Sequence, residues 1–432
     1  MVKSEMRFRE FIKNLKESGR LNEIDYPVSK YFEAPYMASK SDGPIFFNDI
    51  SKSRAVMNLL GSRDELGSML GVSKDEIIDR LSKVDFSGKV VLVNDSPTKQ
   101  NEINEKDVDL TKLPIMKHFE KDGGLGYITA GIVVTEFEGE TNASIHRLMI
   151  IDKNRLAARL VPPRHTYVLH KKASEKNQKL PIAIVIGPDP IITYASTTRV
   201  PLGKEFEYAA SLRGEPVELF ECSNGIKVPH AEYVLEGYID PIKRVPEGPF
   251  VDITGTYDIV RDEPVITVTK IWHRNDPIYH GILPAGPEHL LMMGVPYEPK
   301  IYKAVSEVTT VKNVVLTEGG CCYLHAIVQI KKQTEGDGKN AIMAAFAAHT
   351  SLKHVVVVDE DINIFDQNDV EFAIATRVKG DKDILIITNV RGSSLDPRGE
   401  IDGTTTKVGI DATKVLNCSE LFERAKLKTF EN

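Results

Sequence analysis

The sequence is poor in cysteine. Its four cysteines form no CxxC motif, and one pair is adjacent in the chain: Cys222, Cys321, Cys322 and Cys418. Two adjacent cysteines have poor geometry for bridging each other. We therefore expect no disulfide framework, and thiols that are reduced and partly buried, as in a cytoplasmic protein.

Long hydrophobic runs and an excess of positive charge are also missing. No stretch approaches the ~20 apolar residues that a membrane-spanning helix needs, and the start MVKSEMRFREF has no apolar signal region. Lys and Arg number 55 against 62 Asp and Glu, a formal net charge of −7. We therefore expect a soluble protein that binds neither nucleic acid nor membrane. An anionic substrate would need a local positive site.

The length of 432 residues predicts two or three domains. At the N-terminus, apolar residues with helical spacing predict a helix over residues 4–18: Phe8, Phe11, Ile12 and Leu15. Strand-like runs at 45–50 and 89–95 and a helical stretch at 73–83 follow. The polar residues 94–110 indicate a linker or a long loop. These patterns predict a small α/β segment over residues 1–105.

The middle and the last third of the chain differ in pattern. Residues 112–275 contain many short β-branched runs between turn residues, which is typical of a barrel or sandwich. The last third alternates apolar strands with helical patterns, which predicts a parallel α/β sheet followed by a long loop after Thr388. Its strands are expected at 325–330, 354–359 and 383–388, and its helices at 338–350 and 366–378. We place these two domains at 106–295 and 296–432.

Two carboxylates flank a tight turn in the sequence Glu247-Gly-Pro-Phe-Val-Asp252. Gly248 and Pro249 favour a turn, so the two acids lie on either side of a bend. Such a pair can differ in pKa if one member is desolvated and the other is paired with a cation, as proton transfer near neutral pH requires. The alternative is an ordinary acidic turn on the surface, because turns of this composition are common.

A second candidate is the strand-like sequence Asn142-Ala-Ser-Ile-His-Arg147. Strand alternation places Asn142, Ser144 and His146 on one face and Arg147 on the other. Arginine suits carboxylate recognition because its planar fork can grip both oxygens, although a surface salt bridge is an equally simple role. Asn142 together with His165 and Glu205 would offer an oxygen and nitrogen ligand set suited to Mn²⁺ or Mg²⁺. Their spacing alone carries no specificity, and His165 could be structural.

Signatures of other enzyme classes are missing. Gly123-Gly124 lacks the spacing of a phosphate-binding loop, and Gly281-Ile-Leu-Pro-Ala-Gly286 lacks the serine of a nucleophile elbow. The residues alone therefore describe an acidic protein with a barrel and an α/β domain and a candidate acid turn. They do not define a reaction.

Read together, four segments resemble the UbiD decarboxylase family. They are NASIHRLMIIDKNRLAARLVPPRH (142–165), EFEYAASLRGEPVEL (205–219), VPEGPFVDITGTY (245–257) and TTKVGIDATK (405–414). The resemblance implies an α+β / α/β fold, in which a split β-barrel domain holds prenylated FMN and an α/β domain carries oligomer contacts. It also implies Mn²⁺ or Mg²⁺ and a nearby K⁺ at the flavin phosphate.

The resemblance assigns roles to individual residues. Arg147, Glu247 and Asp252 would be the catalytic arginine–acid–acid set, with Asp at the last position where some members carry Glu. Asn142, His165 and Glu205 would ligate the divalent metal. The expected flavin contacts are Ser144, Ile145, Arg147, Arg164, His165 and, as a weaker candidate, Lys407. The segment 195–198 would hold K⁺.

The implied reaction is the reversible, non-oxidative decarboxylation of an α,β-unsaturated acid. The segments at 320–349 and 391–397 look most like archaeal members, among which are decarboxylases of trans-anhydromevalonate 5-phosphate that give isopentenyl phosphate in a mevalonate pathway. The alternatives are an aromatic acid decarboxylase of the 4-hydroxybenzoate type and a non-catalytic flavin-binding protein. A flavin prenyltransferase would supply the cofactor, and the chain would form a dimer or hexamer. Lys117, His118 and His146 are candidates for a cationic site that holds a substrate phosphate.

Overall fold

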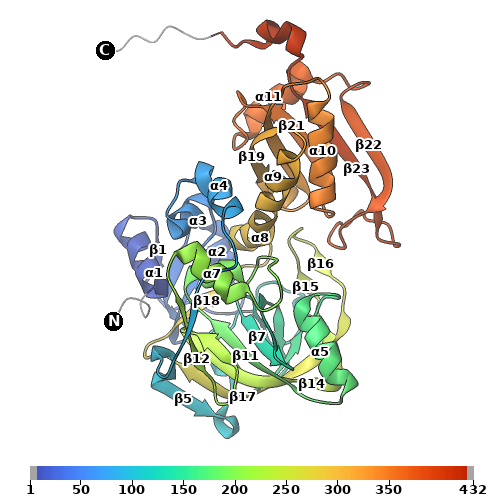
Figure 1. The fold of residues 1–432 in the computed structure, drawn as a ribbon. Helices are drawn as coiled ribbons and strands as arrows, with labels where there is room; N and C mark the ends of the chain where they lie inside the picture. The colour runs from blue at the N-terminus through green and yellow to red at the C-terminus, as the bar shows by residue number, and fades with distance from the viewer. Residues whose placement is uncertain (1–6, 426–432) are drawn as a thin grey trace. The chain divides into compact units, whose positions relative to one another are not determined.

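The structure is a computed structural model that describes residues 7–425 (Figure 1). The chain packs as two compact units that divide between Met293 and Gly294. The predicted N-terminal helix is α1 (Arg7–Glu17), which buries Phe8, Ile12 and Leu15, and residues 4–6 of the prediction lie outside the described residues. Within residues 7–425, no helix is long and apolar enough to cross a membrane.

The first unit begins with a small mixed sheet. Its strand order is β1 (Asn22–Ile24), β2 (Ile45–Ile50), β3 (Ser53–Met57) and β18 (Ile278–Gly281). The last strand comes from far along the sequence and pairs in parallel with β3, so the N-terminal segment and the middle of the chain share one unit. The helices α2 (Glu33–Lys40), α3 (Arg63–Leu70) and α4 (Ile77–Ser82) belong to this region.

A nine-stranded sheet forms the centre of the first unit, and every neighbouring pair in it is antiparallel. The order is β6 (Tyr127–Ile128), β9 (Leu148–Ile150), β10 (Arg155–Ala158), β17 (Arg261–His273), β14 (Tyr233–Glu247), β11 (Leu180–Ile186), β7 (Ile132–Phe137) and β8 (Glu140–Ile145), and β5 (Asn101–Asn104) also pairs with β17. In the described chain the ends β6 and β8 do not pair, so the sheet stays open. The α+β fold class is confirmed, without a closed barrel.

The prediction of a linker over residues 94–110 is wrong at its centre. Asn101–Asn104 form β5, which pairs antiparallel with Lys270–His273 at one side of the central sheet. Its residues alternate between half-buried and exposed, so the strand has little apolar sequence to reveal it.

Four helices and two small sheets complete the first unit. The helices are α5 (His165–Glu175), α6 (Pro190–Ala195), α7 (Glu205–Arg213) and α8 (Pro287–Gly294). β12 (Val217–Glu221) lies between β13 (Lys227–Pro229) and β4 (Val90–Val93), while β15 (Phe250–Val251) pairs with β16 (Tyr257–Asp258). The helix α5 packs against β8 and β14. Both β8 and the end of β14 carry predicted site residues.

The second unit is an α/β layer built on five strands. Their order is β19 (Thr310–Leu316), β20 (His325–Lys331), β21 (His354–Asp359), β23 (Thr404–Ala412) and β22 (Ile384–Arg391), with helices α9 (Glu298–Ser306), α10 (Asp337–Ala348) and α11 (Gln367–Arg377). The inner strands β20, β21 and β23 are parallel, and β20 and β21 are two of the three expected strands. The third expected strand, at 383–388, is the edge strand β22, which runs antiparallel to β23, as β19 does to β20. The sheet is therefore mixed, not all parallel. The expected long loop is also shorter, because β22 continues to Arg391 and pairs it with Thr404.

Candidate active site

Arg147 and Glu247 form a buried ion pair. Arg147 lies between β8 and β9, and Glu247 is the last residue of β14. The arginine donates from Nε to Oε1 at 3.0 Å and from NH2 to Oε2 at 2.8 Å, the two parallel bonds of a fork on a carboxylate. The Glu247 side chain is 0% exposed and that of Arg147 is 10% exposed. The predicted pair is thus brought together from the β8–β9 connection and the end of β14.

Two more carboxylates surround the same guanidinium. Asp252 Oδ2 lies 3.7 Å from Arg147 NH1, and Asp258 Oδ2 accepts a hydrogen bond from NH2 at 3.1 Å. Asp258 also accepts from Arg261 at 2.6 Å. Asp252 belongs to the predicted set, whereas sequence reasoning missed Asp258. The hairpin that pairs Phe250 with Asp258 brings it to the arginine, and the Thr254-Gly255 turn was the available signal.

The mutual contacts shift the pKa values of this cluster. Burial opposes the charge of Arg147, but its three carboxylate neighbours raise the pKa of the guanidinium overall. Burial also pushes the pKa of Asp258 upward, yet the hydrogen bond from Arg261 and the charge of Arg147 hold it below its ordinary value. Burial lowers the pKa of His289 on α8, with Asp252 acting against and Arg147 reinforcing this shift. His289 is a further neighbour of the cluster that the sequence did not reveal.

The acid turn is held from behind by backbone contacts. The Gly123 N–H donates to the Pro249 carbonyl at 2.9 Å, and the Tyr127 hydroxyl donates to the same oxygen at 3.4 Å. A Cβ on Gly123 would lie 2.3 Å from the Gly248 carbonyl oxygen, so only glycine fits this approach. Burial and the charge of Glu247 raise the pKa of Tyr127. The turn between Glu247 and Asp252 is therefore fixed on its rear side.

The three predicted metal ligands are placed around β8. Asn142 lies on β8, while His165 and Glu205 are the first residues of α5 and α7. The Asn142 amide donates to Ser144 Oγ and to Thr166 Oγ1, each at 2.9 Å, and Thr166 directly follows His165. The Glu205 carboxyl accepts from the Ala143 backbone N–H, next to Asn142. These contacts orient the Asn142 amide so that Oδ1, the atom that would bind a metal, points away from the hydroxyls.

The donor set fits a divalent cation. Glu205 is 5% exposed and has no ion pair within residues 7–425. Burial raises its pKa to about 7. A bound cation would supply the missing counter-charge. Among the described residues, no three His, Cys, Asp or Glu side chains form a cluster suited to a metal.

His146 lies in the same polar network. Its Nδ1 is 3.0 Å from the Arg159 carbonyl oxygen, which can only accept, so Nδ1 carries the proton and Nε2 is an acceptor. Nε2 lies 2.9 Å from Ser144 Oγ and 3.0 Å from Thr166 Oγ1. The predicted common face of Asn142, Ser144 and His146 thus agrees with the structure.

The expected cationic cluster for a phosphate is wrong for its two histidines. Burial lowers the pKa of His146 to about 4 and that of fully buried His118 to about 3, so both are neutral near pH 7. Lys117 is the remaining cation, and its Nζ is 3.4 Å from the Gly124 carbonyl.

The other flavin candidates differ in their surroundings. Ser144 and Ile145 lie on β8, and Arg164 is exposed immediately before α5. Lys407 lies on β23 in the second unit, where its Nζ donates to the Thr350 carbonyl at 2.7 Å and burial lowers its pKa to about 8. The hydroxyls of the expected K⁺ segment donate to carbonyls of α6: Ser196, Thr197 and Thr198.

Family models match nearly the whole length of the chain. Three models of 3-octaprenyl-4-hydroxybenzoate carboxy-lyase, UbiD, match it: the N-terminal domain at residues 12–84, the Rift-related domain at 89–287 and the C-terminal domain at 290–412. The chain belongs to the UbiD family. Curated UbiD relatives include the anhydromevalonate phosphate decarboxylase of Methanosarcina mazei, 75% identical over 97% of this chain and 99% of that protein. The anhydromevalonate phosphate decarboxylase of Methanothermobacter thermautotrophicus is 51% identical over 96% of this chain and 99% of that protein.

Solved UbiD-class structures share the whole fold. The enzyme HmfF from Pelotomaculum thermopropionicum, in complex with FMN, matches with a TM-score of 0.94 and 37% identity over 97% of both chains. An evolved dimeric form of HmfF in complex with prFMN matches with a TM-score of 0.90 and 36% identity, over 98% of this chain and 97% of that one. The 3,4-dihydroxybenzoic acid decarboxylase of Klebsiella pneumoniae matches with a TM-score of 0.93 and 27% identity. The match covers 98% of this chain and 97% of that one.

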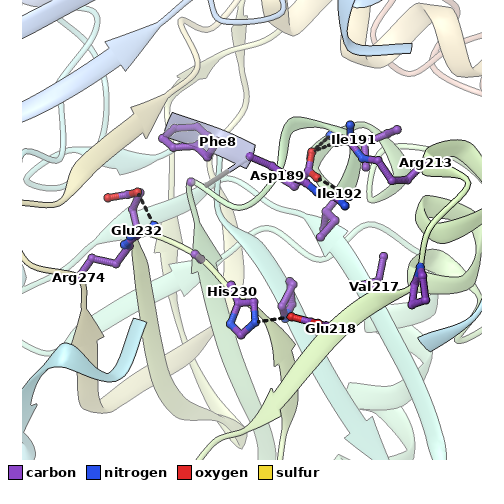
Figure 2. Close-up of a pocket in the computed structure, with 15 residues that line it drawn as sticks. Phe8, Asp189, Ile191, Ile192, Arg213, Val217, Glu218, His230, Glu232 and Arg274 are labelled. Carbon is purple, nitrogen blue, oxygen red and sulfur yellow. Dashed lines mark hydrogen bonds and ion pairs between the residues drawn. The ribbon is translucent and has the colours of Figure 1, made fainter. Parts of the chain in front are cut away.

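A separate small cavity in this UbiD protein lies beside the N-terminal helix (Figure 2). It has a volume of about 40 Å³, which is room for only one or two water molecules. Its lining arginines and carboxylates are equal in number, since Arg7, Arg213 and Arg274 stand against Asp189, Glu218 and Glu232. Asp189 pairs with Arg7 and Arg213, and Glu232 pairs with Arg274. The cavity therefore belongs to the ionic attachment of α1, not to a second ligand site.

Proposed function

We propose that the chain decarboxylates trans-anhydromevalonate 5-phosphate to isopentenyl phosphate with prenylated FMN, in the isoprenoid branch of a mevalonate pathway. The observation that carries the chemistry is the bidentate grip of Arg147 on buried Glu247, with Asp252 beside the same guanidinium. The choice of substrate is supported by two relatives named anhydromevalonate phosphate decarboxylase, which are 75% and 51% identical to this chain.

The proposed cofactor site lies around β8. When bound, prenylated FMN supplies the electron sink for the charge that decarboxylation leaves on carbon. Asn142, His165 and Glu205 would hold Mn²⁺ or Mg²⁺ at its phosphate, and residues 195–198 would hold K⁺. Ser144, Ile145 and Arg164 would line the flavin. The burial of Glu205, which has no ion pair among the described residues, supports a cation at this position.

The roles proposed for the chain's own residues follow from the geometry around Arg147. Its Nε donates to Glu247 and its NH2 to Glu247 and Asp258, while among residues 7–425 the partner of NH1 is Asp252, at 3.7 Å. The NH1 edge is therefore the part that orients the substrate carboxylate. Glu247 in its acid form would protonate the carbon after carbon dioxide leaves, and Asp252 would balance the charge of the arginine.

An aromatic acid is the second candidate substrate. Solved relatives named as decarboxylases of 3,4-dihydroxybenzoic and vanillic acid share the fold with TM-scores of 0.93 and 0.87. A non-catalytic flavin-binding protein is the least supported alternative, because pure binding has no use for a buried acid paired with a carboxylate clamp.

The deciding experiment is product analysis of the holo-protein. It is incubated separately with anhydromevalonate phosphate, 4-hydroxybenzoate and 3,4-dihydroxybenzoate, and the products are identified by mass. We expect isopentenyl phosphate from the first acid and no product from the aromatic acids. Turnover of an aromatic acid alone would replace the proposed substrate, and no release of carbon dioxide from any acid would remove the proposed reaction.

We also propose a cellular setting. A flavin prenyltransferase would provide the modified flavin, and the protein would act in the cytoplasm as a homo-oligomer, a dimer or hexamer. The domain at 296–432 would carry the contacts between subunits. A structural relative described as an evolved dimeric form supports association.

A further inference from the structure

The five-stranded sheet of the second unit ends differently on its two sides. One edge strand, β19, has polar residues at its exposed positions, Thr310 and Lys312, and a bulge between Val311 and Asn313. Charged side chains and bulges commonly keep an edge strand from pairing with another chain. The opposite edge strand, β22, lies next to β23 (Figure 1). It has no charged residue and no proline over residues 384–390, Ile-Leu-Ile-Ile-Thr-Asn-Val.

Two isoleucines of β22 are exposed to solvent. Ile384 is 39% exposed and Ile386 is 63% exposed. They lie opposite Ile410 and Val408 of β23, and Ile410 packs against an apolar cluster that contains residues of α11. The isoleucines therefore extend this apolar face to the edge of the sheet. Exposed apolar side chains on an edge strand are typical of a surface that binds another chain.

The backbone of β22 also has unpaired groups on its outer side. The Asp411 N–H donates to the Asp383 carbonyl at 2.9 Å, so these two residues form a hydrogen-bonded pair of the antiparallel ladder. Bonded and non-bonded pairs alternate along such a ladder. Ile384 and Ile386 are therefore non-bonded members, and their N–H and C=O groups point away from β23. In the described chain no further strand pairs with this edge.

We propose that the outer edge of β22 binds β22 of a second copy of this chain, so that the two sheets continue into one across a two-fold axis. The inference rests on the homo-oligomer of the proposed function and names its contact surface. A two-fold axis makes a strand antiparallel to its own copy, and the same surface serves both subunits. The ladder is regular over residues 384–387, and a bulge precedes Val390. We therefore place the axis at Ile386, within the regular part.

The charges at the two ends of β22 complement each other in this arrangement. With Ile386 opposite its own copy, residues 381–383 lie beside residues 389–391 of the second copy. The first segment, Asp-Lys-Asp, has a net charge of −1, and the second ends in an exposed arginine. Neither Asp381 nor Arg391 has an ion-pair partner in the described chain. The two-fold axis forms this contact twice, so each copy supplies the counter-charge that the other lacks.

The first test measures the mass of the holo-protein in solution by light scattering. Ile386→Lys places a charge in the proposed pairing, and the fold of one subunit should survive it because Ile386 is largely exposed. We expect the mass of the assembly to fall two-fold, from dimer to monomer or from hexamer to trimer. Ile242→Lys is the control, because Ile242 is 71% exposed on β14 of the first unit. Its assembly should keep the native mass.

A charge exchange tests the same contact without changing an apolar residue. Asp381→Arg and Arg391→Asp should each raise the dissociation constant of the contact roughly 10-fold, because each places like charges side by side across the axis. The two changes together restore opposite charges and should return the constant to near its native value. Sedimentation over a range of concentrations provides the measurement.

Four results would overturn the inference: a monomeric native protein, an Ile386→Lys assembly of native mass, single charge variants that associate as the native protein does, or a double variant that associates no better than the single ones. Decarboxylation is measured on the same samples. An active enzyme with any of these results keeps the proposed reaction and loses the proposed contact. An inactive native protein with the expected changes in mass would reject the reaction alone.

Discussion

The guanidinium of Arg147 is bound edge-on to the carboxyl of Glu247, although the two residues lie 100 positions apart in the chain. Two parallel hydrogen bonds fix the plane of the arginine, and Glu247 has no exposure to solvent. Removal of either partner leaves a buried charged group without its main contact, so their effects on activity will not be additive.

Glu247→Gln should abolish turnover while flavin and metal remain bound. Glutamine keeps the shape of the side chain and can accept one of the two hydrogen bonds from Arg147, but it has no transferable proton. Positioned acids contribute about 10²–10⁴ in rate, so the loss should be at least this large. Exchange of the vinylic proton with deuterated solvent is the decisive measurement. Exchange as fast as in the native enzyme would move the role to another residue, Asp252 first. Asp252→Asn is the comparison and should cost less.

Protein produced without a flavin prenyltransferase should be inactive and nearly colourless. The residues proposed around β8 would hold a phosphate-bearing cofactor, and that cofactor would supply the electron sink for the charge left by decarboxylation. Co-production should give flavin-like absorbance and a bound mass that matches prenylated FMN. Full activity with unmodified FMN, or with no flavin, would contradict the mechanism.

His165→Ala should lower Mn²⁺ content and flavin occupancy together while the fold survives, because it removes one of three proposed ligands. Elemental analysis and absorbance provide the measurement. Unchanged values of both would show that the ligand assignment is wrong.

Thr166→Val should weaken Mn²⁺ binding without touching a ligand. The variant removes the hydroxyl that accepts from the Asn142 amide, so the amide loses part of its orientation. Loss of such supporting contacts typically lowers metal affinity about 10- to 100-fold. Titration of metal-free protein with Mn²⁺ measures this directly. Ser174→Ala, which removes a hydroxyl bonded to the His170 carbonyl on the same helix, is the control and should bind normally.

His118→Leu should make stability less dependent on pH in acid. The folded protein holds His118 neutral to about pH 3, whereas an unfolded histidine binds a proton near pH 6.5. The unfolded state therefore gains protons first, and the native protein loses stability as pH falls below about 6.5. Leucine removes this contribution. Thermal midpoints at several pH values should fall less steeply for the variant, and equal slopes would contradict the neutral, buried state of His118.

Strand alternation and apolar runs predicted much of what positions the site. The shared face of Asn142, Ser144 and His146 follows from the two-residue period of a strand, and their hydrogen bonds agree with it. Asp258 escaped prediction because its contact with Arg147 depends on the register of a short hairpin, which distant packing sets. The sequence also could not predict that His118 is neutral, because this depends on burial in the folded chain.

The polar strand β5 shows the same limit at the level of the fold. Its residues have no apolar alternation, and only the free edge of β17 gives them a partner. The antiparallel edge strands β19 and β22 likewise have the apolar character of their parallel neighbours, so composition did not distinguish their direction.

The turn between Glu247 and Asp252 packs on one side against the backbone of Gly123, which leaves little room for substitution there. At Gly123 any side chain would collide with the Gly248 carbonyl, and the Gly123 N–H is already committed to Pro249. A lineage that changes its preferred acid must therefore do so through side chains in front of the turn. We therefore expect random mutagenesis for new substrates to recover almost no variants at Gly123.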